Sequence, residues 1–174
     1  MSLNNEQDKN LCELVMELIG KRDDSPEFQN FLRVVGEPST VDKVGSMKSY
    51  SFYQLGLDFD YETVRQSFDS ITFELDTAGI RSGEIQPYTH DLPVGIKLTD
   101  SCAEVERKLG VKPESSYWVE GCQSSHCDAK SRASDYWQHY QVPPYYFTFI
   151  FDSPEGGLHL LGVDLLVARK RNAT

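Results

Sequence analysis

The sequence predicts an α+β fold made of two tandem helix-then-antiparallel-strand repeats that share or abut one sheet, with an extra N-terminal helix. Three observations lead to this prediction. Several segments alternate apolar and polar residues, as strands with one buried face do. Other segments carry helix start and stop signals. Both kinds of segment recur in the same order in the first and second parts of the 174-residue chain.

The first part of the chain begins with two predicted helices. Apolar residues recur at every third or fourth position across residues 5–19, which predicts a helix with one apolar stripe. A second helix is predicted to start at Ser25, which can cap it, with Pro26 in the first helical position. Gly36 favours the left-handed conformation that ends a helix, and Pro38 prevents its continuation.

Alternating segments then predict strands. Apolar residues occupy every second position in segments 50–52, 55–61 and 71–75, which is typical of an antiparallel sheet with one buried face. Residues 39–49 are polar and are predicted to form a connection. Residues 79–98 are rich in glycine and proline, which predicts a linker.

The second part of the chain follows the same order. Ser101 and Glu104 fit a capping box at the start of a helix, and Gly110 ends it. A polar stretch, predicted as a long loop, runs to residue 134, and strands are predicted at 145–151 and 158–167.

The helical positions of the two parts match at one constant offset, and this match sets the predicted unit boundaries. The units are an N-terminal helix packing on the first repeat (1–24), the first repeat (25–78), the linker (79–98), the second repeat (99–167) and a basic tail (168–174).

Charge and hydropathy exclude two classes of partner. The formal net charge is -10, whereas a protein that binds a nucleic-acid backbone needs a basic face. The longest apolar run is broken by Gly162 and Asp164 and is too short to insert into a membrane. The N-terminal residues lack the basic start and apolar stretch of a signal peptide, which predicts a cytoplasmic protein.

The segment from Gly95 to Pro113, with its cap, apolar helix face and glycine stop, resembles the helix-loop signature of the β-lactamase-inhibitor-protein-like fold. That fold includes the small outer-membrane lipoproteins of the barrel-assembly machinery. A weaker copy of the signature runs from Phe31 to Pro38. The resemblance implies a protein that presents an open sheet face or loops to another protein.

A second resemblance is to bacterial toxin-immunity proteins. It is carried by Val35-Gly36-Glu37-Pro38, by Leu55-Gly56-Leu57-Asp58-Phe59-Asp60, by Leu92-Pro93-Val94-Gly95-Ile96 and by Leu109-Gly110. This resemblance implies an immunity-type inhibitor that masks a partner protein.

Two sets of residues are candidates for partner binding. Four carboxylates should share the wet face of the first strands, and four aromatic residues cluster beside the long loop of the second part. These predicted partner-binding residues are Asp58, Asp60, Glu74, Asp76, Tyr136, Trp137, Tyr140 and Tyr146. The carboxylates also permit cation binding or acid–base chemistry, and a solvated face is the default interpretation.

The long loop offers a different chemistry. Cys122, His126 and Cys127 are soft ligands suited to zinc, with His139 within reach, although the spacing is not that of a zinc knuckle. The same thiols and imidazoles also permit a Cys-His nucleophile, or a disulfide in an exported chain.

The sequence therefore favours a noncatalytic module that binds another protein, a basic one by charge, with no catalytic residue assigned and no cofactor apart from the zinc alternative. The other hypotheses are a metal-binding or hydrolytic protein that uses Cys122, His126 and Cys127, and a cell-envelope accessory protein. A homodimer is compatible with the same pattern.

Overall fold

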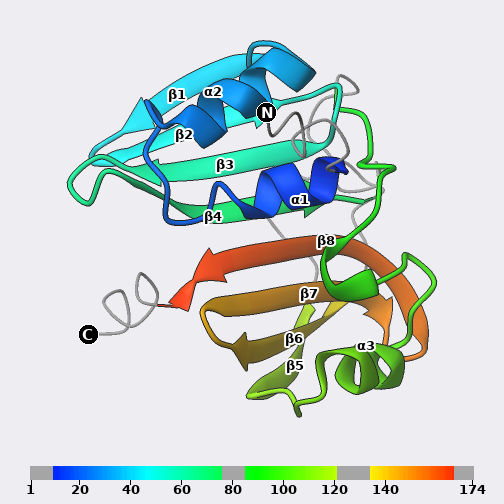
Figure 1. The fold of residues 1–174 in the computed structure, drawn as a ribbon. Helices are drawn as coiled ribbons and strands as arrows, with labels where there is room; N and C mark the ends of the chain where they lie inside the picture. The colour runs from blue at the N-terminus through cyan, green and yellow to red at the C-terminus, as the bar shows by residue number, and fades with distance from the viewer. Residues whose placement is uncertain (1–9, 76–84, 121–133, 167–174) are drawn as a thin grey trace, which may run out of the picture.

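One antiparallel sheet with short helices on one face accounts for most of the described residues (Figure 1). The computed structural model describes residues 10–75, 85–120 and 134–166. The eight strands lie in the order β1-β2-β3-β4-β8-β7-β6-β5, and all neighbours are antiparallel. Their bounds are β1 Thr40–Val44, β2 Met47–Phe52, β3 Leu57–Glu62, β4 Ser67–Glu74, β5 Ser115–Glu120, β6 Ser134–Val142, β7 Tyr145–Ser153 and β8 Gly156–Leu165.

The helical segments are short and lie on the same face of the sheet (Figure 1). They are α1 Leu11–Met16, α2 Pro26–Val35, the 3-10 turn η2 Pro93–Gly95 and α3 Cys102–Leu109. The predicted start of α2 is confirmed, because Ser25 accepts a hydrogen bond from the Phe28 N–H and Pro26 is in the first turn. The capping box of Ser101 and Glu104 is confirmed as well. Within the described ranges, no helix has the length and apolar character needed to cross a membrane.

The hydrophobic core lies between the helices and the sheet. Phe31 of α2 is fully buried, and its ring lies 5.2 Å from Phe52 and 5.3 Å from Phe59, edge to face. The core continues without interruption from β4 into β8 and β7, where Phe73, Val163 and Phe149 belong to the same cluster of buried side chains. All the described strands except the two at the sheet edges therefore contribute to one core.

The predicted α+β fold of two helix-then-strand repeats is wrong. The described residues are mainly strand, and the helices of six, ten and eight residues are appendages of a single sheet. The physical reason is the pairing of β4 with β8, in which Ile71 lies opposite Val163. This ladder joins strands that are far apart in the sequence and makes the sheet and the core continuous.

Both edge strands were also missed, because residues 39–49 and 114–134 were predicted as polar connections. Residues 39–49 contain β1 and the start of β2, and residues 114–134 contain β5 and the first residue of β6. An edge strand is exposed on both faces, so its sequence does not alternate between apolar and polar residues. The periodicity that reveals the inner strands is therefore absent here.

The first helix is shorter than the apolar stripe suggests. The prediction covered residues 5–19, of which 5–9 lie outside the described residues; within the described part the helix occupies Leu11–Met16 and ends three residues early. After Met16 the chain turns toward β4, where Ile19 forms a bridge with Phe68 and the Gly20 N–H donates to the Phe68 carbonyl. Hydrogen bonds to the sheet thus replace the last helical turn.

Candidate protein-binding face

The two faces of the sheet are distinguished by contacts with α2. Phe52 and Phe59 contact Phe31 of α2, so their positions face the helices. Successive residues of a strand project to opposite faces. Asp58 and Asp60, on either side of Phe59, therefore lie on the face away from the helices, which we call the outer face.

Three carboxylates form a row on the outer face. Asp58 and Asp60 lie on β3, and Glu74 lies on β4 two positions beyond Thr72, the residue opposite Asp58. We call Asp58, Asp60 and Glu74 the acidic row. Hydroxyl groups surround it: the Ser49 Oγ donates a hydrogen bond of 2.6 Å to the Asp60 carboxylate.

The acidity extends beyond the row. Asp42 of β1 lies opposite Ser49, and Asp164 of β8 lies opposite Ser70, so both share this face. Along the described strand positions of the outer face on β1 to β4 and β8, every charged residue is a carboxylate. This side of the sheet therefore carries a negative potential, offset at the end of β3 by Arg65, which lies 3.5 Å from the Glu62 carboxylate.

Burial and mutual repulsion disfavour ionisation in the row. Burial and, to a lesser extent, the neighbouring Asp58 carboxylate raise the pKa of Glu74 to about 7. Burial also raises the pKa of Asp58, while a hydrogen bond from Ser51 opposes the shift and the Asp60 charge adds to it. Glu74 thus changes charge near neutral pH, where an approaching cation would favour its ionised form.

Replacing Glu74 with glutamine is expected to raise the free energy of unfolding by about 2 kcal/mol at pH 8. The Glu74 pKa is higher in the folded state than its ordinary value of 4.5, so above pH 7 the folded state bears the cost of an ionised, partly buried carboxylate. The gain should fade as pH falls from 7 to 4.5, where the folded protein takes up the proton. Urea denaturation of the variant and the wild type at pH 8, 6 and 4.5 measures this difference in unfolding free energy.

The control for this prediction is Glu37→Gln at an exposed site beyond the end of α2. It should shift stability little at any of the three pH values. If Glu74→Gln is no more stable than the wild type at pH 8, the burial of this carboxylate is not a cost in solution.

The aromatic residues predicted for partner binding do not form one surface. Register places Trp137 and Tyr146 on the outer face, and Tyr136 and Tyr140 on the face that carries the helices. Tyr140 is fully buried and donates a hydrogen bond to Gln138, and Tyr146 is 5% exposed. The structure therefore assigns Tyr140 to the core, and leaves Tyr136 and Trp137 half-buried.

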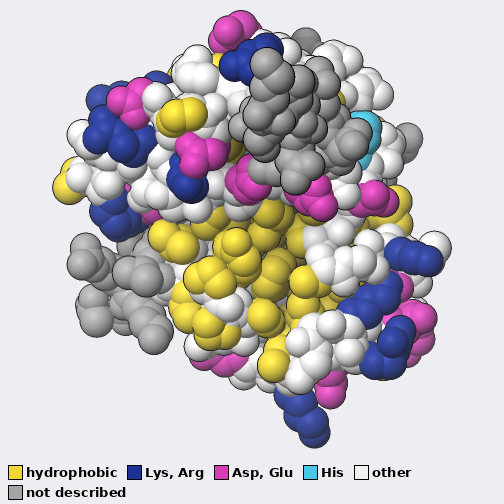
Figure 2. Space-filling view, viewed as in Figure 1, with side chains coloured by type: hydrophobic (Ala, Val, Ile, Leu, Met, Phe, Trp, Pro, Cys, Tyr) yellow, Lys and Arg dark blue, Asp and Glu magenta, His cyan; other side chains and the backbone are white. Residues whose placement is uncertain are grey.

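On the helix-bearing face, apolar side chains gather over β6, β7 and β8 between α1 and α3, where no described helix covers the sheet (Figure 2). Half-buried Tyr136, Val142 and Tyr145 belong to these strands and pack against the core. The aromatic and acidic candidates thus belong to different faces, apart from Trp137 and Tyr146.

A polar cluster around His139, which the sequence did not indicate, lies on the outer face beside Trp137 and Tyr146. His139 is buried, with Nε2 2.9 Å from the Tyr117 hydroxyl and Nδ1 3.0 Å from the Thr148 hydroxyl. The rings of Trp137 and Tyr146 lie within 6.0 Å of the imidazole. The cluster depends on the pairing of β5 with β6, so only recognition of β5 as a strand could have revealed it.

The remaining predicted site residues are outside the described part of the chain. They are Asp76 and the three members of the proposed metal set, Cys122, His126 and Cys127. Among the described residues, no group of three or more His, Cys, Asp or Glu side chains could hold a metal ion. The zinc and nucleophile hypotheses stay predictions.

Comparison with known proteins concerns the fold alone. No family model matches the chain, and no curated protein matches its sequence. Among solved structures, it is similar to an extracellular protein containing a SCP domain from Bacillus anthracis str. Ames, with a TM-score of 0.56 and 12% sequence identity. The match covers 98% of this chain and 53% of that one. The chain thus spans about half of that protein and matches it as one continuous fold, in agreement with the single sheet rather than two repeats.

Proposed function

We propose that this protein is a noncatalytic protein-binding module whose outer face binds a basic surface of another protein. The observation that carries the proposal is the charge of the outer face: at its described strand positions on β1 to β4 and β8, there is no Lys or Arg, and the charged residues are Asp and Glu. An inhibitor of the immunity type acts by covering a partner's functional surface, and that role is part of the proposal.

The geometry of the acidic row suits recognition of Lys or Arg side chains. The row lies on adjacent central strands, so its carboxylates are held on a rigid platform. Charge complementarity of this kind increases the association rate and excludes acidic competitors. A cation placed beside Glu74 would lower its raised pKa, so binding near neutral pH should release a proton.

Neighbouring hydroxyl groups support the noncatalytic assignment. Asp58 is bonded by Ser51 and Asp60 by Ser49, so the row's described partners are side chains that orient carboxylates. The serine hydroxyls can also form hydrogen bonds with a docked protein. The carboxylates keep lone pairs that can accept hydrogen bonds from Lys or Arg side chains.

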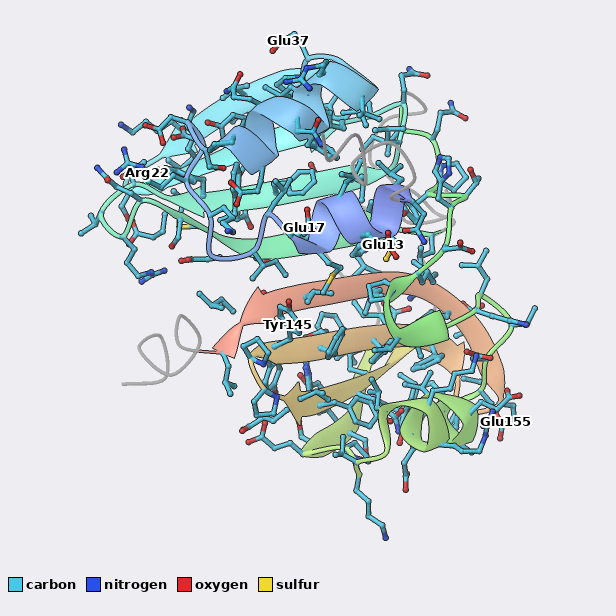
Figure 3. The ribbon with its side chains drawn as sticks, viewed as in Figure 1. Glu13, Glu17, Arg22, Glu37, Tyr145 and Glu155 are labelled. Carbon is cyan, nitrogen blue, oxygen red and sulfur yellow. The ribbon has the colours of Figure 1, made fainter. Side chains whose placement is uncertain are left out.

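Two double variants test the face. Asp58→Asn with Asp60→Asn neutralises the row while keeping its shape, and Glu37→Gln with Glu155→Gln removes the same amount of charge elsewhere. Figure 3 labels Glu37 beyond α2 and Glu155 beside α3, both away from the row. Proteins that co-purify with the tagged wild-type chain at low salt are identified, and the binding of each purified candidate is measured by calorimetry.

A basic partner should bind the Asp58/Asp60 variant about tenfold more weakly than the wild type, and the Glu37/Glu155 variant nearly as tightly as the wild type. An equal loss in both variants would mean that only the net charge matters. Unchanged binding in both variants would exclude the outer face as the binding site.

A further inference from the structure

The two edges of the sheet differ in how they are protected. β1 and β5 are the outermost of the described strands, so each has a described strand partner along one side only. β1 carries Asp42 and Lys43 at its centre, as protected edges often do. β5 has no charged residue from Ser115 to Val119, so among the described residues its sequence Ser-Ser-Tyr-Trp-Val lacks the central charges that protect β1.

Aromatic side chains mark the β5 edge. Tyr117 is 44% exposed and Trp118 is 52% exposed, although both belong to a strand. They lie on opposite faces: the Tyr117 ring stacks beside Trp137, and the Trp118 ring lies 5.1 Å from Tyr136. A strand added to β5 would therefore meet large apolar surface on both faces as well as the backbone groups of the edge.

We propose that β5 pairs with β5 of a second copy of this chain, antiparallel about a two-fold axis through Trp118. In this register Trp118 lies opposite its own copy, and Tyr117 lies opposite Val119 of the other copy. Aromatic pairs and aromatic–β-branched pairs are the favourable cross-strand combinations. Ser116 lies opposite position 120, so this register pairs no two residues of like charge.

The same construction fails at the other edge. A two-fold axis through the middle of β1 places Asp42 opposite Asp42, and a shift by one residue places Lys43 opposite Lys43. Like charges directly opposite each other oppose pairing. The two central registers of β1 are thus disfavoured by charge, whereas the central register of β5 is not, and pairing through β5 joins two sheets into one without using the acidic row.

The net charge of the chain gives this dimer a distinctive salt dependence. Each copy carries a formal charge of -10, so two copies repel each other at long range. Added salt screens this repulsion but leaves the aromatic contacts intact. The dimer should therefore tighten with salt, whereas binding of a basic partner to the outer face should weaken.

Sedimentation equilibrium of the full chain from about 1 to about 500 micromolar tests the proposal. The wild type should pass from monomer to dimer in this range, at lower concentration in 0.5 M than in 0.05 M NaCl as screening predicts. Because Ser116 is exposed, its charge variants should fold normally. Ser116→Lys should tighten the dimer about fivefold and Ser116→Glu should weaken it about fivefold, through the two symmetry-related pairs with position 120.

Two further variants separate the edge from a general charge effect. Trp118→Lys should abolish the dimer, and far-ultraviolet circular dichroism confirms that the sheet is retained. Val41→Lys at the β1 edge adds the same charge as Ser116→Lys, and its dimerisation should stay close to that of the wild type. A chain that stays monomeric throughout, or a dimer that the variants at positions 116 and 118 do not change, overturns the proposal, and in the first case a strand of another protein becomes the candidate for this edge.

Discussion

Replacing Gly56 with alanine is expected to lower the free energy of unfolding by about 4 kcal/mol, one of the two largest single effects in this chain. Gly56 has φ of +63°, a left-handed conformation that costs an L-residue about 1 kcal/mol. A Cβ atom there would also lie 2.5 Å from the Gln86 carbonyl oxygen and 2.6 Å from the Tyr88 nitrogen.

These close neighbours cannot yield cheaply because they are backbone atoms held by hydrogen bonds. The Tyr88 N–H donates to the Glu74 carbonyl at 2.6 Å, and the Glu74 N–H donates to the Gly56 carbonyl at 2.9 Å. Making room for a methyl group would break this network and move the backbone of Glu74, which belongs to the acidic row. The Gly56 variant should therefore impair partner binding as well as stability.

Gly45→Ala is the matched control. Gly45 has φ of +60°, nearly the same conformation, but a Cβ there would meet nothing within 4 Å. Its cost should be about 1 kcal/mol, the conformational term alone. Urea denaturation of both variants measures the difference, and equal costs would show that close approach at Gly56 is not what makes glycine necessary.

Replacing Phe31 with alanine is expected to cost about 4 kcal/mol, because the substitution leaves a cavity between α2 and the sheet. The Phe31 ring is fully buried and contacts the rings of Phe28, Phe52 and Phe59. Short helices derive little stability from their own hydrogen bonds, so α2 depends on this packing. The backbone amide protons of α2 should lose protection from hydrogen exchange in the Phe31→Ala variant.

Val34→Ala at an exposed position of the same helix is the control. Val34 is 62% exposed, so its truncation should change the unfolding free energy by less than about 0.5 kcal/mol. If Phe31→Ala costs as little as Val34→Ala, α2 does not contribute its apolar face to the core.

The sequence alone predicted the features that depend on neighbouring residues. A cap needs only a short polar side chain three residues from an N–H group, so Ser25 and Ser101 could be assigned without tertiary information. Alternation along β3 predicted that Phe59 and Asp58 occupy opposite faces, and they do. Local geometry determines both kinds of feature.

The candidate site was predictable only where strict alternation holds. Alternation on β3 and β4 placed Asp58, Asp60 and Glu74 on one face. Alternation was not used for the aromatic set, because β6 had not been predicted as a strand, and Tyr140 points into the core. The His139 cluster requires a cross-strand neighbour, Tyr117, from a segment that had been predicted as a loop.

What the sequence by itself determined was the helix caps, the inner strands other than β6 and the acidic side of the sheet, since each follows from backbone geometry and side-chain spacing within a few residues. Tertiary structure alone decided that the sheet is continuous, through the pairing of β4 with β8, and that β1 and β5 are its edges. The physical reason is that strand pairing is a contact between distant segments, whose register no local periodicity encodes. An edge strand also has too little buried surface to leave a pattern in its sequence.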